Sequence, residues 1–132
     1  MNQDPNCIFC KIINKEIPAV IIYEDDKFIA FLDQEPINPG HTVLIPKNHS
    51  QFIWDMPENE LQLALPVSKV IADALQKTYS PARMGLFIEG FDMDHAHIKL
   101  IPLYSPNDIN NQTNSASIED REKEAQKIKN NF

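Results

Sequence analysis

The sequence has no long apolar run and no excess of basic residues. No stretch approaches the roughly 20 apolar residues that a membrane-spanning helix needs. Asp and Glu number 19 against 12 Lys and Arg, which gives a net charge of −7, and no segment of the chain is basic. A protein that binds duplex nucleic acid usually carries a basic patch, and an acidic membrane surface would repel this chain. We therefore expect neither partner, whereas a small anionic ligand remains compatible because a pocket can be locally positive on an acidic protein.

The N-terminus lacks a secretion signal, and cysteine is scarce. Residues 1–6 contain neither a basic segment nor an apolar core, so we expect a cytoplasmic protein. The 2 cysteines, Cys7 and Cys10, form a C-x2-C motif. In a reducing compartment such a pair is more typical of a metal or redox site than of a structural disulfide.

The 132 residues suffice for one domain of ordinary size. Hydrophobic patterning predicts five strands, at residues 20–23, 28–32, 41–46, 84–89 and 95–102. It predicts three helices, at residues 7–14, 58–78 and 117–130. Pro66 lies inside the second helix and should kink or interrupt it, because proline removes a backbone donor. This order predicts an α+β domain built on a mostly antiparallel sheet.

The C-terminal part of the chain differs in composition from the rest. Residues 105–116 are rich in Asn, Ser and Pro and are typical of a loop or mobile linker. Ser117 to Asp120 has the form of a capping box that opens the last helix. This helix has few apolar positions, so we expect it on the surface. We therefore divide the chain into a domain over residues 1–104 and a linker with a surface helix over residues 105–132.

Three basic side chains share one face of the last predicted strand. Alternate residues of a strand point to the same side, so His95, His97 and Lys99 lie together, opposite the apolar Ala96 and Ile98. Such a face is costly in a protein core. Both a functional site and a solvated strand face remain open for it.

The C-x2-C motif has the right spacing to hold one tetrahedral metal ion. Two more ligands must come from elsewhere, and the four histidines of the chain are the natural donors. The alternative is that both cysteines are small buried apolar residues.

Several short motifs together resemble the histidine triad (HIT) family, and its Hint-like branch in particular. They are residues 7–13 (CIFCKII), 16–18 (EIP), 23–26 (YEDD), 30–33 (AFLD), 39–41 (PGH), 45–49 (IPKNH) and 95–102 (HAHIKLIP). The resemblance implies a HIT-like fold with a mostly antiparallel five-stranded sheet, a short N-terminal helix, one long helix and a C-terminal tail helix. The HIT domain would span residues 1–104, and the tail helix would follow it. It also implies a homodimer, for which Phe52, Trp54 and Leu61 are candidate contacts.

The resemblance assigns a metal site and a reacting residue. Structural zinc would be held by Cys7, Cys10, His49 and His95. His97 would be the nucleophile that attacks the α-phosphorus of a nucleotide, forming a nucleotidyl-histidine that water then hydrolyses.

The resemblance also assigns a nucleotide pocket for a purine nucleotide or nucleoside phosphoramidate. Asp33 would accept hydrogen bonds from the ribose hydroxyls, and His41 would support the catalytic strand. The residues expected around the base are all apolar: Ile8, Phe9, Ile12, Ile17, Phe31 and Leu32.

The chain departs from the family pattern at two places. The third triad position, a histidine in the family, is Lys99, which can only donate hydrogen bonds. It could hold an anionic oxygen of the substrate or pair with Asp92 or Asp94. The connection over residues 89–94 is short, has one glycine and adds these two acids beside the expected phosphate site.

Three functions follow from these observations. The first is hydrolysis or transfer at the α-phosphate of a nucleoside phosphoramidate through His97, with Lys99 and His41 as further catalytic residues. The second is a catalytically weak nucleotide-binding module that keeps the fold and the zinc. The third, a redox protein using the two cysteines, lacks the β-α context of a thioredoxin-like site.

Overall fold

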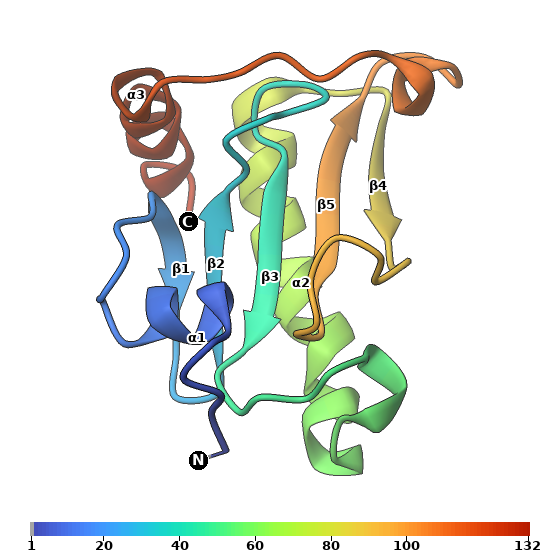
Figure 1. The fold of residues 1–132 in the computed structure, drawn as a ribbon. Helices are drawn as coiled ribbons and strands as arrows, with labels where there is room; N and C mark the ends of the chain where they lie inside the picture. The colour runs from blue at the N-terminus through green and yellow to red at the C-terminus, as the bar shows by residue number, and fades with distance from the viewer. Residues whose placement is uncertain (1) are drawn as a thin grey trace.

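A computed structural model describes residues 2–132 and shows one antiparallel sheet with helices on both faces (Figure 1). The strands are β1 (Ile21–Glu24), β2 (Phe28–Leu32), β3 (Thr42–Pro46), β4 (Arg83–Phe87) and β5 (Ile98–Leu103). The helices are α1 (Ile8–Ile13), α2 (Glu58–Tyr79) and α3 (Ile118–Lys129), with short 3-10 turns at Ile53–Asp55 and Asp108–Asn110. The strand order is β1-β2-β3-β5-β4, and every neighbouring pair is antiparallel. The predicted α+β architecture is confirmed.

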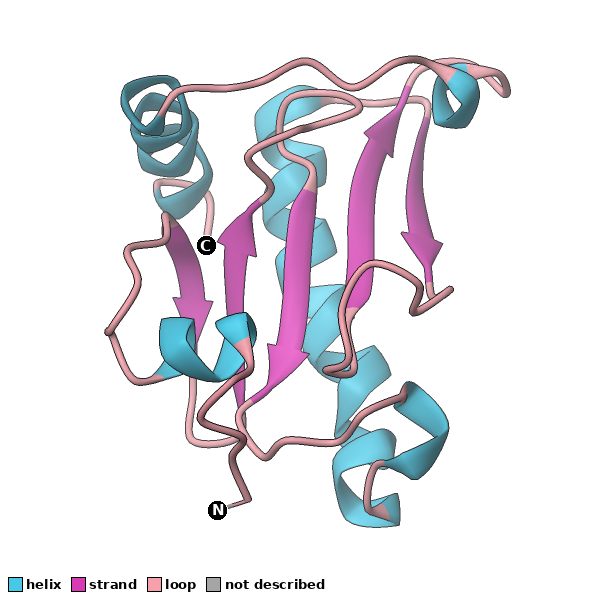
Figure 2. Cartoon of the chain, viewed as in Figure 1, coloured by secondary structure: helices cyan, strands magenta, loops and turns pink. Residues whose placement is uncertain are grey.

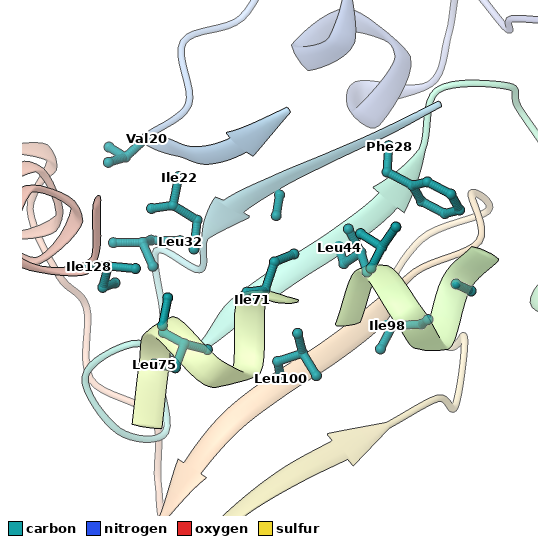
Figure 3. Close-up of a cluster of buried hydrophobic side chains, with 14 of the residues drawn as sticks. Val20, Ile22, Phe28, Leu32, Leu44, Ile71, Leu75, Ile98, Leu100 and Ile128 are labelled. Carbon is teal, nitrogen blue, oxygen red and sulfur yellow. The ribbon is translucent and has the colours of Figure 1, made fainter. Parts of the chain in front are cut away.

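The core lies mainly between the sheet and α2. Side chains of α2 such as Ile71 and Leu75 pack against Leu44 and Leu100 of the sheet (Figure 3). A second apolar cluster lies on the opposite face under α1, and it includes Ile12 and Phe31 among others. Every residue of β2 and β3 is buried as a result. These two buried strands therefore form the floor beneath α1.

The last strand begins later than predicted, at Ile98 rather than residue 95. The preceding residues are bonded to the segment after β3 instead of to a strand, since the Ala96 N–H donates to the Ser50 carbonyl (2.7 Å). The alternation of faces nevertheless extends back through this segment. Ala96 and Ile98 point into the core on the α2 side, whereas His97 and Lys99 face the α1 side.

Helix α2 continues through Pro66, so the predicted interruption is wrong. Pro66 lies on the exposed face of the helix. The carbonyl of Gln62, which loses its donor there, can be satisfied by water, and this lowers the cost of an internal proline. No helix within residues 2–132 is both long and apolar enough to cross a bilayer.

The C-terminal helix is more than the surface helix expected. Ser117 caps it as predicted, with its hydroxyl accepting from the Asp120 N–H (3.0 Å). Ala125 and Ile128 are buried, however, and Ile128 belongs to the main core cluster (Figure 3). The segment before it crosses the end of the sheet (Figure 2). The domain boundary at residue 104 stays a prediction.

Candidate functional site

Four side chains from three separate segments of the chain meet at the start of α1. They are Cys7, Cys10, His49 and His95, and their ligand atoms all lie within 4.8 Å of one another. The Nδ1 atom of His95 is 3.3 Å from Cys7 Sγ, 3.6 Å from Cys10 Sγ and 3.1 Å from His49 Nδ1. Such separations suit four atoms around one ion, since zinc–sulfur and zinc–nitrogen bonds are about 2.3 and 2.0 Å long. These four residues could hold a metal ion.

Local structure prepares these residues as ligands. Cys7 is the N-cap of α1, so the first turn of the helix brings Cys10 next to it. The Nε2 atom of His95 is 2.8 Å from the Pro46 carbonyl. Because a carbonyl can only accept, Nε2 carries the proton and Nδ1 presents its lone pair to the cluster. Burial lowers the pKa of His95 to about 4, which keeps the ring in its neutral, ligating form.

Beside this cluster lies a cleft of about 580 Å³ between α1 and the sheet. Its lining includes every residue that was predicted for nucleotide binding and catalysis, namely Ile8, Phe9, Ile12, Ile17, Phe31, Leu32, Asp33, His41, His97 and Lys99. The apolar members come from α1, the segment after it and the end of β2. The polar members follow β2, precede β3, or lie in and just before β5. The fold therefore brings the predicted residues into one cavity.

His97 is buried at the floor of this cleft. Its Nδ1 atom donates to the His95 carbonyl (2.7 Å), so Nε2 carries the lone pair. Within residues 2–132, Nε2 has no hydrogen-bond partner. The ring edge-packs against Phe9, at 5.6 Å between centroids. His97 is thus held in the tautomer that can attack an electrophile.

Lys99 lies in an ion-pair network at the mouth of the cleft. Its ammonium contacts the Asp92 carboxylate and is 3.1 Å from Glu89 Oε1. Burial disfavours its charge, but the hydrogen bonds to Asp92 and Glu89 prevail and raise the pKa of Lys99 above its ordinary value. Glu89 Oε1 is also 4.0 Å from His97 Nε2. The expected pairing with Asp92 is confirmed, and the second partner is Glu89 rather than Asp94.

His41 is another polar residue of the cleft lining. Its Nδ1 atom accepts from the Ile37 N–H (3.0 Å), so Nε2 carries the proton and points to Asp33 Oδ2 at 3.5 Å. Burial lowers the pKa of His41. Gly40 has φ +90°, and a Cβ there would collide with the Tyr79 ring. Only glycine therefore fits the turn that presents His41 to the cleft.

Some lining residues were not singled out by the sequence. They are Pro18, Ala19, Gln34, Glu35, Ile37, Val43, Met93, Thr113 and Arg121. Arg121 comes from α3, one helical turn before the buried Ala125. That i, i+4 spacing is the signal that could have placed it on the inner side of the helix.

Comparison with known proteins agrees with this geometry. Residues 14–106 match the HIT domain. A HIT-like protein of Borreliella burgdorferi is 41% identical over 106 residues, which cover 75% of this chain and 76% of that protein. An adenosine 5'-monophosphoramidase of Saccharomyces cerevisiae is 40% identical over 100 residues, covering 75% of this chain and 63% of that protein.

Solved structures extend the match over nearly the whole chain. A HIT-like protein of Bartonella henselae superposes with a TM-score of 0.84 at 32% identity, covering 98% of both chains. A zinc-bound histidine triad protein of Mycobacterium smegmatis superposes with a TM-score of 0.77 at 27% identity, covering 95% of this chain and 91% of that one. The match includes the sheet, the long helix and the C-terminal helix. On these grounds the chain belongs to the HIT family.

Proposed function

We propose that this protein is a HIT-type nucleotide hydrolase or nucleotidyltransferase that acts at the α-phosphate of a purine nucleoside phosphoramidate or a related nucleotide. The observation that carries the proposal is the unpartnered Nε2 of His97 at the floor of the cleft. Relatives named adenosine 5'-monophosphoramidase, at 40% identity, and adenylylsulfatase, at 31% identity, support the substrate class.

His97 is the proposed nucleophile. Its Nε2 lone pair attacks the α-phosphorus, the bond from phosphorus to the amine breaks, the amine takes up a proton from solvent as it leaves, and the nucleotidyl group becomes bonded to Nε2. Water then attacks the same phosphorus and gives up a proton to solvent, the phosphorus–Nε2 bond breaks, and the nucleoside monophosphate is released. The His95 carbonyl holds Nδ1–H throughout, so the ring needs no reorientation between the two steps.

The remaining side chains bind and orient the nucleotide. The apolar side chains of α1 and β2 enclose the base, and Asp33 accepts hydrogen bonds from the ribose hydroxyls. The Glu35 N–H donates to Asp33 Oδ1 (2.8 Å) and fixes the carboxylate. Lys99 binds a non-bridging phosphate oxygen, while Asp92 and Glu89 hold its ammonium at the cleft.

The metal has a structural role in this proposal. Cys7, Cys10, His49 and His95 would hold zinc, and their donor set and spacing fit it. Zinc would tie α1 to the segment that carries His97 and so stabilise the cleft.

One observation favours a second candidate, the nucleotide-binding module with weak or no turnover. Lys99 forms ion pairs with the carboxylates of Asp92 and Glu89, which lie beside the expected phosphate site. Glu89 Oε1 is also 4.0 Å from Nε2 of the proposed nucleophile, His97. Repulsion between these carboxylates and a phosphate would slow chemistry while leaving the base pocket intact.

Release of AMP from adenosine 5'-phosphoramidate separates the two candidates. We expect turnover by the wild type and none by His97→Ala, with unchanged metal content in the variant. A wild type that binds AMP without turnover would favour the binding module. A wild type that neither binds AMP nor releases it would contradict both.

A further inference from the structure

The C-terminal segment supplies part of the cleft wall. Thr113 and Arg121 line the same cavity as His97 and Asp33. Both lie beyond residue 106, where the match to the HIT domain ends. The proposed reaction gives neither of them a role.

The fold holds this segment in place at the Asp33 end of the cleft. The Ala116 N–H donates to the Gln34 carbonyl (2.9 Å), and the Asn114 N–H donates to the Pro36 carbonyl (3.4 Å). Farther along, Ile128 is fully buried in the core. Arg121, which is half-buried, therefore has a defined position.

The guanidinium of Arg121 keeps N–H donors available for a ligand. Its Nε donates to the Ala116 carbonyl (3.2 Å), which directs the side chain. Within residues 2–132 it forms no ion pair with a carboxylate, whereas Lys99, the other cation of the cleft lining, is paired with Asp92 and Glu89. A planar guanidinium can lie against a base or donate to several oxygens at once.

Arg121 also stands where the cleft meets a second cavity. That cavity, of about 540 Å³, lies between α3 and the β2–β3 connection, and it shares Leu32, Asp33, His41 and Arg121 with the first. The shared residues are those at the end where the ribose is expected. The position of Arg121 is thus at the nucleoside end of the ligand.

We propose that Arg121 is a binding residue for the nucleoside part of the ligand, supplied by α3 to a cleft that the HIT domain otherwise forms. The identity of the ligand rests on the proposed function. A contact with the nucleoside is the same before and during reaction at phosphorus. Its removal therefore raises KM without lowering kcat.

The test compares adenosine and AMP by calorimetry in wild type, Arg121→Ala, Arg121→Lys and Lys129→Ala. Lys129 is an exposed cation of the same helix that lines neither cavity, so Lys129→Ala removes the same charge away from the site. We expect Arg121→Ala to weaken adenosine and AMP binding by the same factor, roughly tenfold, as for loss of a charge-assisted hydrogen bond. Arg121→Lys should be intermediate, and Lys129→Ala should match the wild type.

Three results would overturn the inference. Equal affinity of wild type and Arg121→Ala would remove Arg121 from the ligand and leave the proposed function standing. A loss seen with AMP and not with adenosine would assign Arg121 to the phosphate instead. Failure of wild type to bind either ligand would overturn this inference together with the proposed function. If Arg121→Ala melts well below the wild type, the comparison rests on Arg121→Lys.

Discussion

At the scale of single residues, the ring protons of His95 and His97 lie on different nitrogen atoms. His95 donates from Nε2 to the Pro46 carbonyl and turns Nδ1 to the cysteines. His97 donates from Nδ1 to the His95 carbonyl and leaves Nε2 free in the cleft. The opposite tautomers suit His95 for the proposed metal site and His97 for its proposed role as nucleophile.

Removing the Lys99 ammonium should expose the carboxylates it neutralises. Lys99→Ala leaves Asp92 and Glu89 facing the phosphate, so we expect AMP to bind at least about tenfold more weakly. Asp92→Asn in the Lys99→Ala background should restore part of this loss, because one repulsive charge is removed. Calorimetric titration of both variants measures the effect. Unchanged affinity in Lys99→Ala would place the phosphate elsewhere.

The raised pKa of Lys99 has a consequence for pH dependence. Because the pKa of Lys99 is raised above the ordinary lysine value of about 10.4, the ammonium stays charged throughout the neutral pH range. Its contribution to AMP binding should therefore be constant between about pH 6 and pH 8. In Lys99→His the imidazole loses its charge across this range, so we expect several-fold weaker binding at about pH 8 than at pH 6.

The same variant distinguishes a role in binding from a role in catalysis at position 99. A pH effect on KM alone means that the group at position 99 binds substrate charge. A gain in kcat near neutral pH for Lys99→His would instead show that a titrating group there assists the leaving group.

At the scale of elements, helices α1 and α3 are both stabilised by contacts with the rest of the protein. Helix α1 has 6 residues, too few to be stable alone. Its start is bound into the Cys and His cluster, and its inner side packs on β2 and β3. Helix α3 is similarly tied to the body by Ile128 and by the Tyr79 hydroxyl, which donates to Glu124 (3.0 Å).

We expect one zinc ion per chain, lost on substitution of a ligand. Cys10→Ala should release the metal and lower the free energy of unfolding by several kcal/mol, because binding of a structural metal contributes folding free energy. Native mass spectrometry and thermal melting measure the two effects. His41→Ala, which removes a histidine outside the cluster, should keep the metal. Metal-free wild type together with a Cys10→Ala variant of unchanged melting temperature would contradict the assignment.

Shortening the buried Ile128 side chain of α3 should affect both stability and ligand binding. Ile128 is 0% exposed, so Ile128→Ala should cost about 2–4 kcal/mol in denaturant unfolding. It should also weaken adenosine binding, since α3 carries Arg121. Ile118, 46% exposed on the same helix, is the control, and Ile118→Ala should cost less than about 0.5 kcal/mol. Equal unfolding free energies for the two variants would contradict the docking of α3.

At the scale of the whole molecule, the sheet divides the protein into a core side under α2 and a cleft side under α1 (Figure 1). The two edges of the sheet differ. Helix α3 packs beside β1 at one edge, whereas β4 pairs only with β5 and leaves its outer backbone groups free within residues 2–132. An uncovered edge strand is a natural pairing surface.

The homodimer stays a prediction, and the structure refines which side chains could contribute to it. Leu61 packs against the core, whereas Trp54 is 84% exposed, Phe52 is also exposed, and Leu65 on α2 is 67% exposed. We expect sedimentation at micromolar concentration to give twice the chain mass of 15.1 kDa. Leu65→Asp should shift the species toward the monomer if α2 lies at the two-fold axis. A wild-type mass near 15.1 kDa would contradict the dimer.

Local periodicity in the sequence is enough to predict which side chains of a segment share a face. Alternation placed His97 and Lys99 on one face, and the structure keeps them there although the strand starts only at Ile98. The C-x2-C spacing indicated a metal site, and the motif resemblance selected His49 and His95 as its partners. The shared face of His97 and Lys99 is confirmed because side-chain direction repeats every two residues in extended chain. The structure brings Cys7, Cys10, His49 and His95 together, and the metal that they would hold stays a prediction.

The tertiary structure alone decided which distant residues meet. The spacing of Arg121 and Ala125 could indicate at most an inner side of α3, and only the docking of α3 shows that Arg121 reaches the cleft and that Ile128 enters the core. Likewise, only the folded structure shows that Glu89 joins Asp92 on Lys99. Pro66 likewise looked like a break, and only its position on the exposed side of α2 makes it tolerable. Such features depend on how elements dock, and docking is settled by the sum of many weak contacts between segments remote in sequence rather than by any local pattern.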